Sequence, residues 1–246
     1  MNLLDKAEIR AEIWRLLKEK GIGKPPIFGR IPNFIGSEKA ALNLAKLDIW
    51  KEARVLKVNP DSPQRPVRER ALEEGKKVIM PTPRIKSGFL LLDPNYIPRN
   101  RYREASTIRG AFKWGKLIEP KNFPKIDLVV IGSVAVNKGG DRLGKSEGYA
   151  EIEWAIAYEE GKVDQSTPVV TTVHDIQVVP YEFQVMPYDL PVDLIATPTR
   201  IIKTERRREK PTGIYWNLLD DKKIEEIPIL KERFKSLMKR PSGHEL

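Results

Sequence analysis

The sequence contains no cysteine, only two histidines and no long hydrophobic run. Without cysteine, the chain cannot form disulfide bonds or thiolate-ligated zinc sites. Its most apolar stretch, residues 126–136, is too short to cross a membrane and includes Asp127. Residues 1–20 are charged and amphipathic, unlike a secretory signal, which needs an uninterrupted apolar core. We therefore expect a soluble, cytoplasmic protein with no membrane partner.

Charged residues, by contrast, are abundant, and positive charge is in excess. The 246 residues include 44 Lys and Arg against 34 Asp and Glu, which gives a formal net charge of +10 and a pI near 9.6. The length and the 40% hydrophobic content are those of a globular chain that buries its own core. An excess of positive charge favours anionic partners, so nucleoside phosphates, polycarboxylates and nucleic acids are the ligand classes to consider.

Apolar residues recur at helical spacing near both ends of the chain. Asp5 followed by Glu8 resembles a capping box at the start of the first helix, and Ser37 is a plausible N-cap for the second. A proline- and glycine-rich loop separates these two helices. Helices are expected over residues 3–20, 37–47, 147–160 and 221–239, with the loop over residues 21–36.

Short β-rich runs, separated by Pro and Gly, alternate with helical pattern through the middle of the chain. This alternation predicts an α/β fold of three layers, α/β/α, with a mainly parallel sheet. We expect residues 1–246 to form a single domain with an N-terminal helical segment over about residues 1–50 and a closing C-terminal helix. The expected strands are 55–58, 77–80, 89–92, 127–131, 169–173, 193–196, 200–203 and 213–216, with antiparallel pairing open to the last three.

A glycine-rich turn follows the strand at residues 127–131 and carries Arg142 and Lys145. Because a helix comes next, the turn offers backbone amides, a helix N-terminus and two cations, which together predict phosphate binding. Residues 139–146 also match the Walker A spacing G-x-x-x-x-G-K-[ST]. A P-loop nucleotidase would need a further strand ending in a metal-binding Asp, and His174 interrupts the available candidate. A P-loop and a ligand-free glycine turn remain as alternatives.

Longer motifs run collinearly from about residue 6 to about residue 216. The segments WGKLIEP (114–120), DLVVIGSVAV (127–136) and GDRLGKSEGYAEIEW (140–154) resemble the central block of the 5-formyltetrahydrofolate cyclo-ligases, also called methenyltetrahydrofolate synthetases. The methenyltetrahydrofolate-synthetase-domain-containing subfamily is closer still. Its pattern is matched by GRIPNFIGSEKAA (29–41), VNPDSPQRPVR (58–68), VHDIQVV (173–179) and DLIATPTRII (193–202).

This resemblance implies an ATP- and Mg²⁺-dependent ring closure with a reduced folate as substrate. The formyl oxygen of 5-formyltetrahydrofolate would be phosphorylated, N10 would attack the activated carbon, and phosphate would leave to give 5,10-methenyltetrahydrofolate. Transfer of a phosphoryl group depends on positioned cations, backbone donors and magnesium more than on a protein nucleophile. The many cations and the absence of cysteine fit this chemistry.

The resemblance also implies roles for individual residues. A Lys and an Arg four residues apart on the first helix hold nucleotide phosphates in the family; they correspond to Lys6 and Arg10, which a helix places on one edge. Magnesium would be bound by Glu151 and Asp193. The remaining expected roles are phosphate binding by Gly144, Lys145 and Gly148, catalysis by Lys145 and Arg142, and substrate contact by Tyr149 and Arg30.

The loop departs from the family pattern at several positions. Ser146 and Glu147 replace glycines, which restricts the backbone and adds negative charge beside the phosphates. Ala150 replaces the second tyrosine of the motif, and Ile152 stands where an Arg often follows the carboxylate. For the acidic residue that contacts the pterin, Asp61 is the nearest candidate.

Two other functions stay open. A catalytically silent relative could still bind folate or nucleotide. Alternatively, the basic run at residues 99–109, with Tyr102, Phe112 and Trp114 interleaved, could bind single-stranded RNA, although the chain lacks the signature of an RNA-recognition domain. The adjacent His174 and Asp175 could act as an acid and base or could be structural. No motif specifies an oligomeric state.

Overall fold

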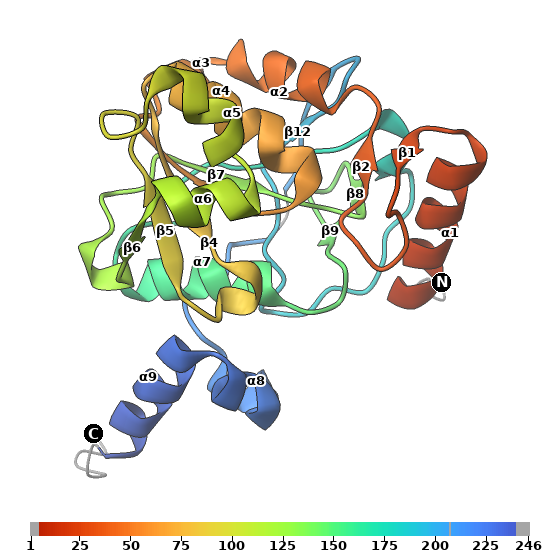
Figure 1. Ribbon diagram of the computed structural model, residues 1–246. Coiled ribbons are helices and arrows are strands. Elements are labelled where there is room, and N and C mark those ends of the chain that lie inside the picture. Colours follow the sequence, from red (N-terminus) through yellow and green to blue (C-terminus); the bar gives the residue numbers. More distant parts are fainter. Residues whose placement is uncertain (1–4, 207, 240–246) are drawn as a thin grey trace.

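The computed structural model describes residues 5–206 and 208–239, and its centre is an eight-stranded sheet (Figure 1). The strands are β3 (Val55–Val58), β4 (Lys77–Pro81), β5 (Phe89–Leu92), β6 (Lys116–Ile118), β7 (Leu128–Ile131), β10 (Val169–Thr172), β12 (Leu194–Ala196) and β13 (Ile201–Lys203). Their order across the sheet is β13-β12-β10-β7-β3-β4-β5-β6. The five central strands are parallel, whereas β13 at one edge and β5 and β6 at the other pair antiparallel. The predicted mainly parallel sheet is confirmed.

Both faces of this sheet are buried, because side chains alternate along each strand and both sets are apolar. Leu56 and Val130 belong to the core on one face, and Val129 and Ile131 belong to the core on the other. Helices cover both faces, so the molecule has the predicted three layers (Figure 1). The first face is covered by α2 (Ser37–Ala45), α3 (Asp48–Glu52), α4 (Arg65–Glu73), α5 (Tyr102–Ala105) and α6 (Ile108–Trp114), and the second by α7 (Tyr149–Glu159) and α9 (Pro228–Met238).

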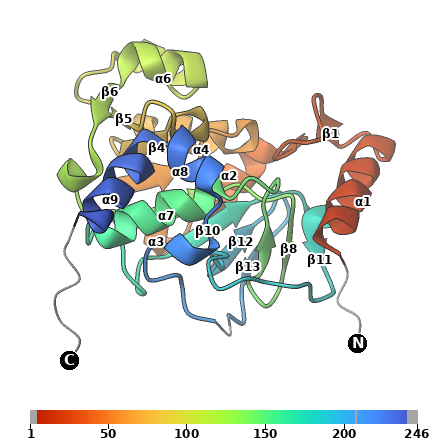
Figure 2. The ribbon, with the colours of Figure 1, turned by 90° about the horizontal axis from the view of Figure 1, so that it is seen from below.

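A third apolar cluster lies beside the sheet, where α1 (Lys6–Glu19) packs against a small sheet (Figure 2). Ile9, Ile13 and Leu17 form the buried stripe of α1, as their spacing predicts, and the side chain of Asp5 caps the helix by accepting from two backbone amides. The small sheet consists of β11 (Val178–Val179), β8 (Ala135–Asn137) and β9 (Arg142–Leu143). Two further short strands, β1 (Gly23–Lys24) and β2 (Asn33–Phe34), pair inside the region expected to be a loop.

The structure corrects three of the expected elements. Residues 213–216 form no strand, because the backbone amide of Ile214 is turned toward Glu159 rather than toward a neighbouring strand. The closing helix is interrupted at Pro228, whose missing amide ends α8 (Asp221–Glu226) before α9 begins. Ser37 is the first residue of its helix rather than the cap; Gly36, with φ of 93°, precedes it.

The chain after β13 crosses the molecule to reach the second helical layer. The indole of Trp154 on α7 donates to the carbonyl of Pro211 at 2.7 Å, which anchors this segment to the helix. From there the chain continues into α8 and α9, and Ile227 and Leu230 are buried in the core of this face. Within the described residues, no helix has the length and apolar composition needed to span a membrane.

Candidate functional site

Two adjoining cavities open where the central strands end. The larger has a volume of about 530 Å³ and is lined by the loops that follow β3, β4 and β7. The smaller, about 300 Å³, lies between α1, the start of α7 and the segment before α9. In the sheet, β4 lies on one side of β3 and β7 lies on the other side. The larger cavity therefore opens at the point where the strand order reverses. Open α/β sheets bind their ligands at this point.

The loop between Leu143 and Tyr149 separates the two cavities, and Gly144, Glu147 and Gly148 line both. Gly148 has φ of +69° and precedes α7, which no side chain caps. The first-turn amides of α7 therefore remain available, and the positive end of the helix dipole lies at the cavities. Both features favour an anionic ligand here.

The same loop carries an internal ion pair. The ammonium of Lys145 lies 3.0 Å from the carboxylate of Glu147, and the guanidinium of Arg84 lies 3.7 Å from the same carboxylate. Lys145 lines the larger cavity. The predicted phosphate-binding cation is thus present at the cavity, with an anionic side chain as its partner.

Arg142 is buried beneath this loop. Its Nη1 donates to the carbonyl of Gly132 at 2.9 Å, and its Nη2 forms an ion pair with Glu151. Burial lowers the pKa of Arg142 to about 10, although nearby carboxylates oppose that shift. Because its guanidinium is engaged on both sides, Arg142 holds Glu151 and the loop in place from below.

Lys6 and Arg10 line the smaller cavity, on the same edge of α1. The ammonium of Lys6 lies 2.6 Å from Asp189, and Arg10 Nε donates to the carbonyl of Gly144 at 2.7 Å. Burial lowers the pKa of Arg10, while Asp189 and Asp5 raise it. The structure therefore brings the first helix and the glycine-rich loop together, although they lie more than a hundred positions apart in the sequence.

Tyr149 and Arg30 line the larger cavity, with Arg30 exposed at its mouth. Asp61 also lines this cavity, and burial raises the pKa of its carboxyl group. A Cβ atom at Gly132 would lie 3.1 Å from the carboxylate of Asp61 and 2.9 Å from the amide oxygen of Gln64, so a larger residue here would displace these side chains.

A buried ion pair in the wall of the larger cavity has no counterpart in the sequence prediction. Glu153 forms it with Lys57, and each side chain is only 3% exposed. Asn59 completes the group by donating its amide to Glu153 at 3.0 Å. Burial raises the pKa of Glu153, and Lys57 opposes that shift. The strand pattern at residues 55–58 and the helix pattern at 147–160 predicted both elements, but no sequence signal pairs them across the sheet.

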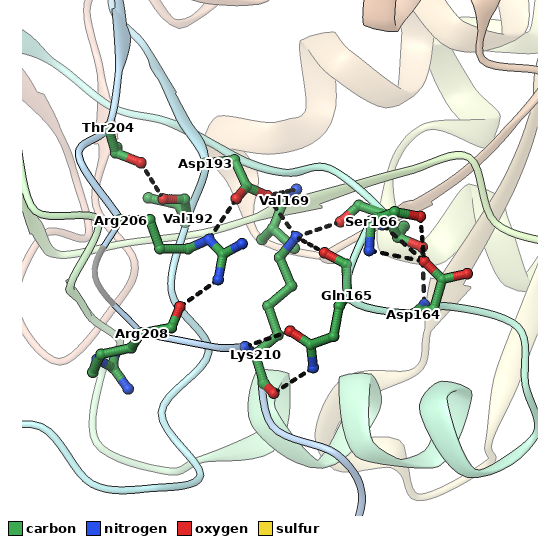
Figure 3. A network of polar contacts seen from close by, with 11 residues as sticks. Asp164, Gln165, Ser166, Val169, Val192, Asp193, Thr204, Arg206, Arg208 and Lys210 are labelled. Carbon is green, nitrogen blue, oxygen red and sulfur yellow. Dashed lines mark hydrogen bonds and ion pairs between the residues drawn. The ribbon is translucent and has the colours of Figure 1, made fainter.

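Asp193 lies elsewhere. It precedes β12, at the amino ends of the parallel strands, whereas the cavities lie at their carboxyl ends. Its carboxylate accepts from the amide of Val169 at 2.8 Å and pairs with Lys210 at 2.8 Å and with Arg206 at 2.9 Å (Figure 3). Asp193 therefore ties the segment after β13 to the sheet and lines neither cavity.

The structure does not support the expected magnesium pair. Glu151 lines both cavities, but Asp193 does not approach it. Within residues 5–206 and 208–239, no three carboxylate or imidazole groups converge as a metal-binding cluster. Magnesium in nucleotide sites is often held by one or two carboxylates together with substrate phosphates. Glu151 fits such a ligand, and Asp193 does not.

The other residues identified in the sequence are engaged in local structure. His174 Nδ1 caps a short 3-10 turn by accepting from the amide of Ile176 at 3.2 Å, and Asp175 accepts from Thr197 and Thr199. In the basic run at residues 99–109, Tyr102 is 8% exposed, so its ring is not available to stack on a base. The pattern that suggested RNA binding therefore loses one of its aromatic groups.

Comparison with known proteins agrees with the fold and with the motifs. The sequence profile of the 5-formyltetrahydrofolate cyclo-ligase family matches residues 3–198. Proteins named methenyltetrahydrofolate synthase domain-containing protein are 40% identical over 233 residues in Bos taurus and 41% identical over 233 residues in Mus musculus. Each alignment covers 93% of this chain but only 61% and 63% of those relatives, so the chain spans about three-fifths of their length.

A solved structure supports the same fold. The NMR structure of Aquifex aeolicus 5,10-methenyltetrahydrofolate synthetase superposes with a TM-score of 0.51 at 19% identity, covering 87% of this chain and 99% of that one. With the match over residues 3–198, the motifs and the sheet agree on one assignment. The chain belongs to the 5-formyltetrahydrofolate cyclo-ligase family.

Proposed function

We propose that the chain catalyses the ATP-dependent cyclisation of 5-formyltetrahydrofolate to 5,10-methenyltetrahydrofolate. One observation carries the proposal: two cavities, about 530 and 300 Å³, adjoin across a single loop that presents a helix N-terminus and a lysine. The larger cavity would hold the folate, and the smaller would hold the nucleotide. Placing the loop between them would put the γ-phosphate close to the formyl group, which is the proximity that phosphoryl transfer needs.

In this proposal the formyl oxygen attacks the γ-phosphorus and ADP leaves. N10 then attacks the activated formyl carbon and loses its proton, and the C–O bond breaks to release phosphate, which takes up that proton, so one ring closes for each ATP consumed. Lys145 would neutralise charge on the transferred phosphoryl group, and the amides at the start of α7 would donate to its oxygens. Lys6 and Arg10 would hold the remaining phosphates in the smaller cavity.

The other side chains at the site would bind the folate and magnesium or hold neighbouring groups in position. Tyr149 and Arg30 would contact the folate, with Arg30 at the mouth available to its glutamyl carboxylates. Arg142 would act as a positioning residue, because its guanidinium is engaged by Gly132 and Glu151. A magnesium ion, when bound, would neutralise phosphate charge, and Glu151 would be its protein ligand.

The test is a turnover assay of the full chain with 5-formyltetrahydrofolate and Mg-ATP, in which methenyltetrahydrofolate and ADP are followed together. Coupled formation of both products, lost in Lys145→Ala, is expected. Lys138→Ala is a suitable control because it removes the same charge from a lysine that lines neither cavity. Formation of ADP without methenyltetrahydrofolate would mean that another molecule accepts the phosphoryl group.

A catalytically silent relative that binds folate or nucleotide is the second candidate. The pairing of Lys145 with Glu147 favours it, since the cation most needed at the phosphate already has a carboxylate partner. Absence of both products, together with measurable binding of 5-formyltetrahydrofolate or Mg-ATP, would support this second function instead.

A further inference from the structure

The smaller cavity has a wall that lies outside the family match. The family profile ends at residue 198, yet one side of the cavity is built by residues between Pro211 and Lys223. This segment is fixed in place: Trp154 donates to the carbonyl of Pro211 at 2.7 Å, and the amide of Ile214 donates to Glu159 at 3.1 Å. Both anchors lie on α7, so the wall is attached to the helix whose N-terminus lies at the site.

The cavity is lined by both charged and apolar residues. Lys6, Arg10 and Gly148 lie at the start of α7, where the helix dipole is positive. About one and about two helical turns after Gly148, Ile152 and Ala155 line the cavity from α7. The segment after residue 211 adds Leu218, an apolar side chain that is 44% exposed and lines this cavity.

Lys223, on α8, adds a cation to this cavity. Its ammonium lies 4.2 Å from the centre of the Tyr149 ring, and in the described part of the chain it forms no ion pair or side-chain hydrogen bond. Lys6, by comparison, is paired with Asp189 at 2.6 Å. Burial lowers the pKa of Lys223, while the nearby Glu147, Glu226 and Asp220 raise it. An ammonium that is partly desolvated and lacks a hydrogen-bond acceptor is suited to bind an anion.

We propose that the segment from Pro211 to Lys223 completes the nucleotide site of this chain, with Lys223 binding a phosphate group and Leu218 packing against the nucleoside. The inference rests on the proposed function, since it assigns the nucleotide to the smaller cavity. It adds residues beyond the family match to the site, and it makes Lys223 a phosphate ligand together with Lys6 and Arg10. The position of Lys223 over Tyr149 would also link this site to the wall of the larger cavity.

The experiment measures the dissociation constants of Mg-ATP and of inorganic tripolyphosphate by calorimetry on the full chain. Lys223→Met keeps the length of the side chain and should weaken the binding of both ligands about tenfold, because both carry phosphate. Lys222→Met is the matched control: it removes the same charge from the neighbouring residue of α8, whose side chain is 77% exposed and lines neither cavity. Leu218→Ala should weaken the binding of Mg-ATP several-fold and leave the binding of tripolyphosphate unchanged.

The outcomes separate the inference from the function on which it rests. If Lys223→Met binds both ligands as Lys222→Met does, Lys223 is not a phosphate ligand and the inference is overturned. If Leu218→Ala changes the dissociation constant of neither ligand, Leu218 does not pack against the nucleoside and that part of the inference is overturned. If the unmodified chain binds neither ligand, the proposed function and the inference fail together. Unchanged thermal unfolding of Lys223→Met, or retention of binding in Lys223→Arg, ensures that lost affinity reflects the site.

Discussion

The carboxylate of Glu147 lies 3.0 Å from the ammonium of Lys145, in the loop that separates the two cavities. The side chains are 33% and 30% exposed, so the pair contributes little to stability, about 1 kcal/mol or less. Its consequence for ligand binding is larger, because a phosphate must compete with Glu147 for Lys145 and must also approach a negative charge. The ion pair must therefore open before Lys145 can bind a phosphate group.

Glu147→Gln should therefore tighten the binding of Mg-ATP by several-fold, since it removes the competing charge without changing the size of the side chain. Calorimetric titration at low and at high salt measures the effect, and the gain should shrink at high salt. Glu52→Gln provides the control, because it makes the same charge change on an exposed residue that lines neither cavity. Equal affinity in both variants would show that Glu147 does not hinder the phosphate.

Ser146→Gly should stabilise the protein. Ser146 has φ of +87°, in the left-handed region that favours glycine, and a serine there costs about 1 kcal/mol. Relief of this strain should raise the melting temperature by about 2–4 °C for a chain of this size. Gly148→Ala gives the opposite test: φ is +69° and no atom lies within 4 Å of the added Cβ, so only backbone strain should lower stability. A lower melting temperature for Ser146→Gly would contradict the argument.

Asp193→Asn should lower the free energy of unfolding by about 2–3 kcal/mol. The substitution leaves the ammonium of Lys210, only 2% exposed, without its carboxylate partner, although two backbone carbonyls still accept from it. Urea unfolding measures the loss. Asp48→Asn, at a position 85% exposed, should change stability by less than about 0.5 kcal/mol.

The same variant distinguishes a structural role from metal binding. Because Asp193 lines neither cavity, the affinity of Asp193→Asn for ATP should depend on magnesium concentration as in the unmodified chain. A weaker dependence on magnesium, with stability unchanged, would make Asp193 a metal ligand after all.

The sequence predicted strands, helix caps and turns whose formation depends on residues that are close together along the chain. The short β-rich runs at residues 55–58 and 89–92 gave strands with the observed bounds, and Asp5 caps α1 as its sequence position indicates. The glycine-rich turn lies between a buried strand and α7, as expected, because its conformation depends on neighbouring residues.

The features that the sequence did not predict depend on contacts between segments that are far apart along the chain. Nothing local pairs Lys57 with Glu153 or places Lys223 over Tyr149, since these contacts exist only once the layers pack. The expectation for Asp193 came from the family resemblance. The sequence left the direction of this strand open, and only the parallel pairing of β12 with β10 places Asp193 at the amino edge of the sheet, away from the cavities.

His174 should make stability depend on pH. Burial lowers its pKa below the ordinary value of about 6.5, and the neutral Nδ1 is needed as the acceptor for Ile176. The unfolded chain therefore binds the proton more readily than the folded chain. This contribution to stability is complete above about pH 6.5 and is lost as the pH falls through the folded-state pKa.

His174→Asn keeps an acceptor but cannot titrate, so its stability should fall less between about pH 7.5 and about pH 5. Burial alone would raise the pKa of Asp175, but hydrogen bonds from Thr199 and Thr197 lower it, so Asp175 titrates below this range. Urea unfolding at several pH values measures both profiles, and parallel profiles would show that His174 has the same pKa in the folded and unfolded states.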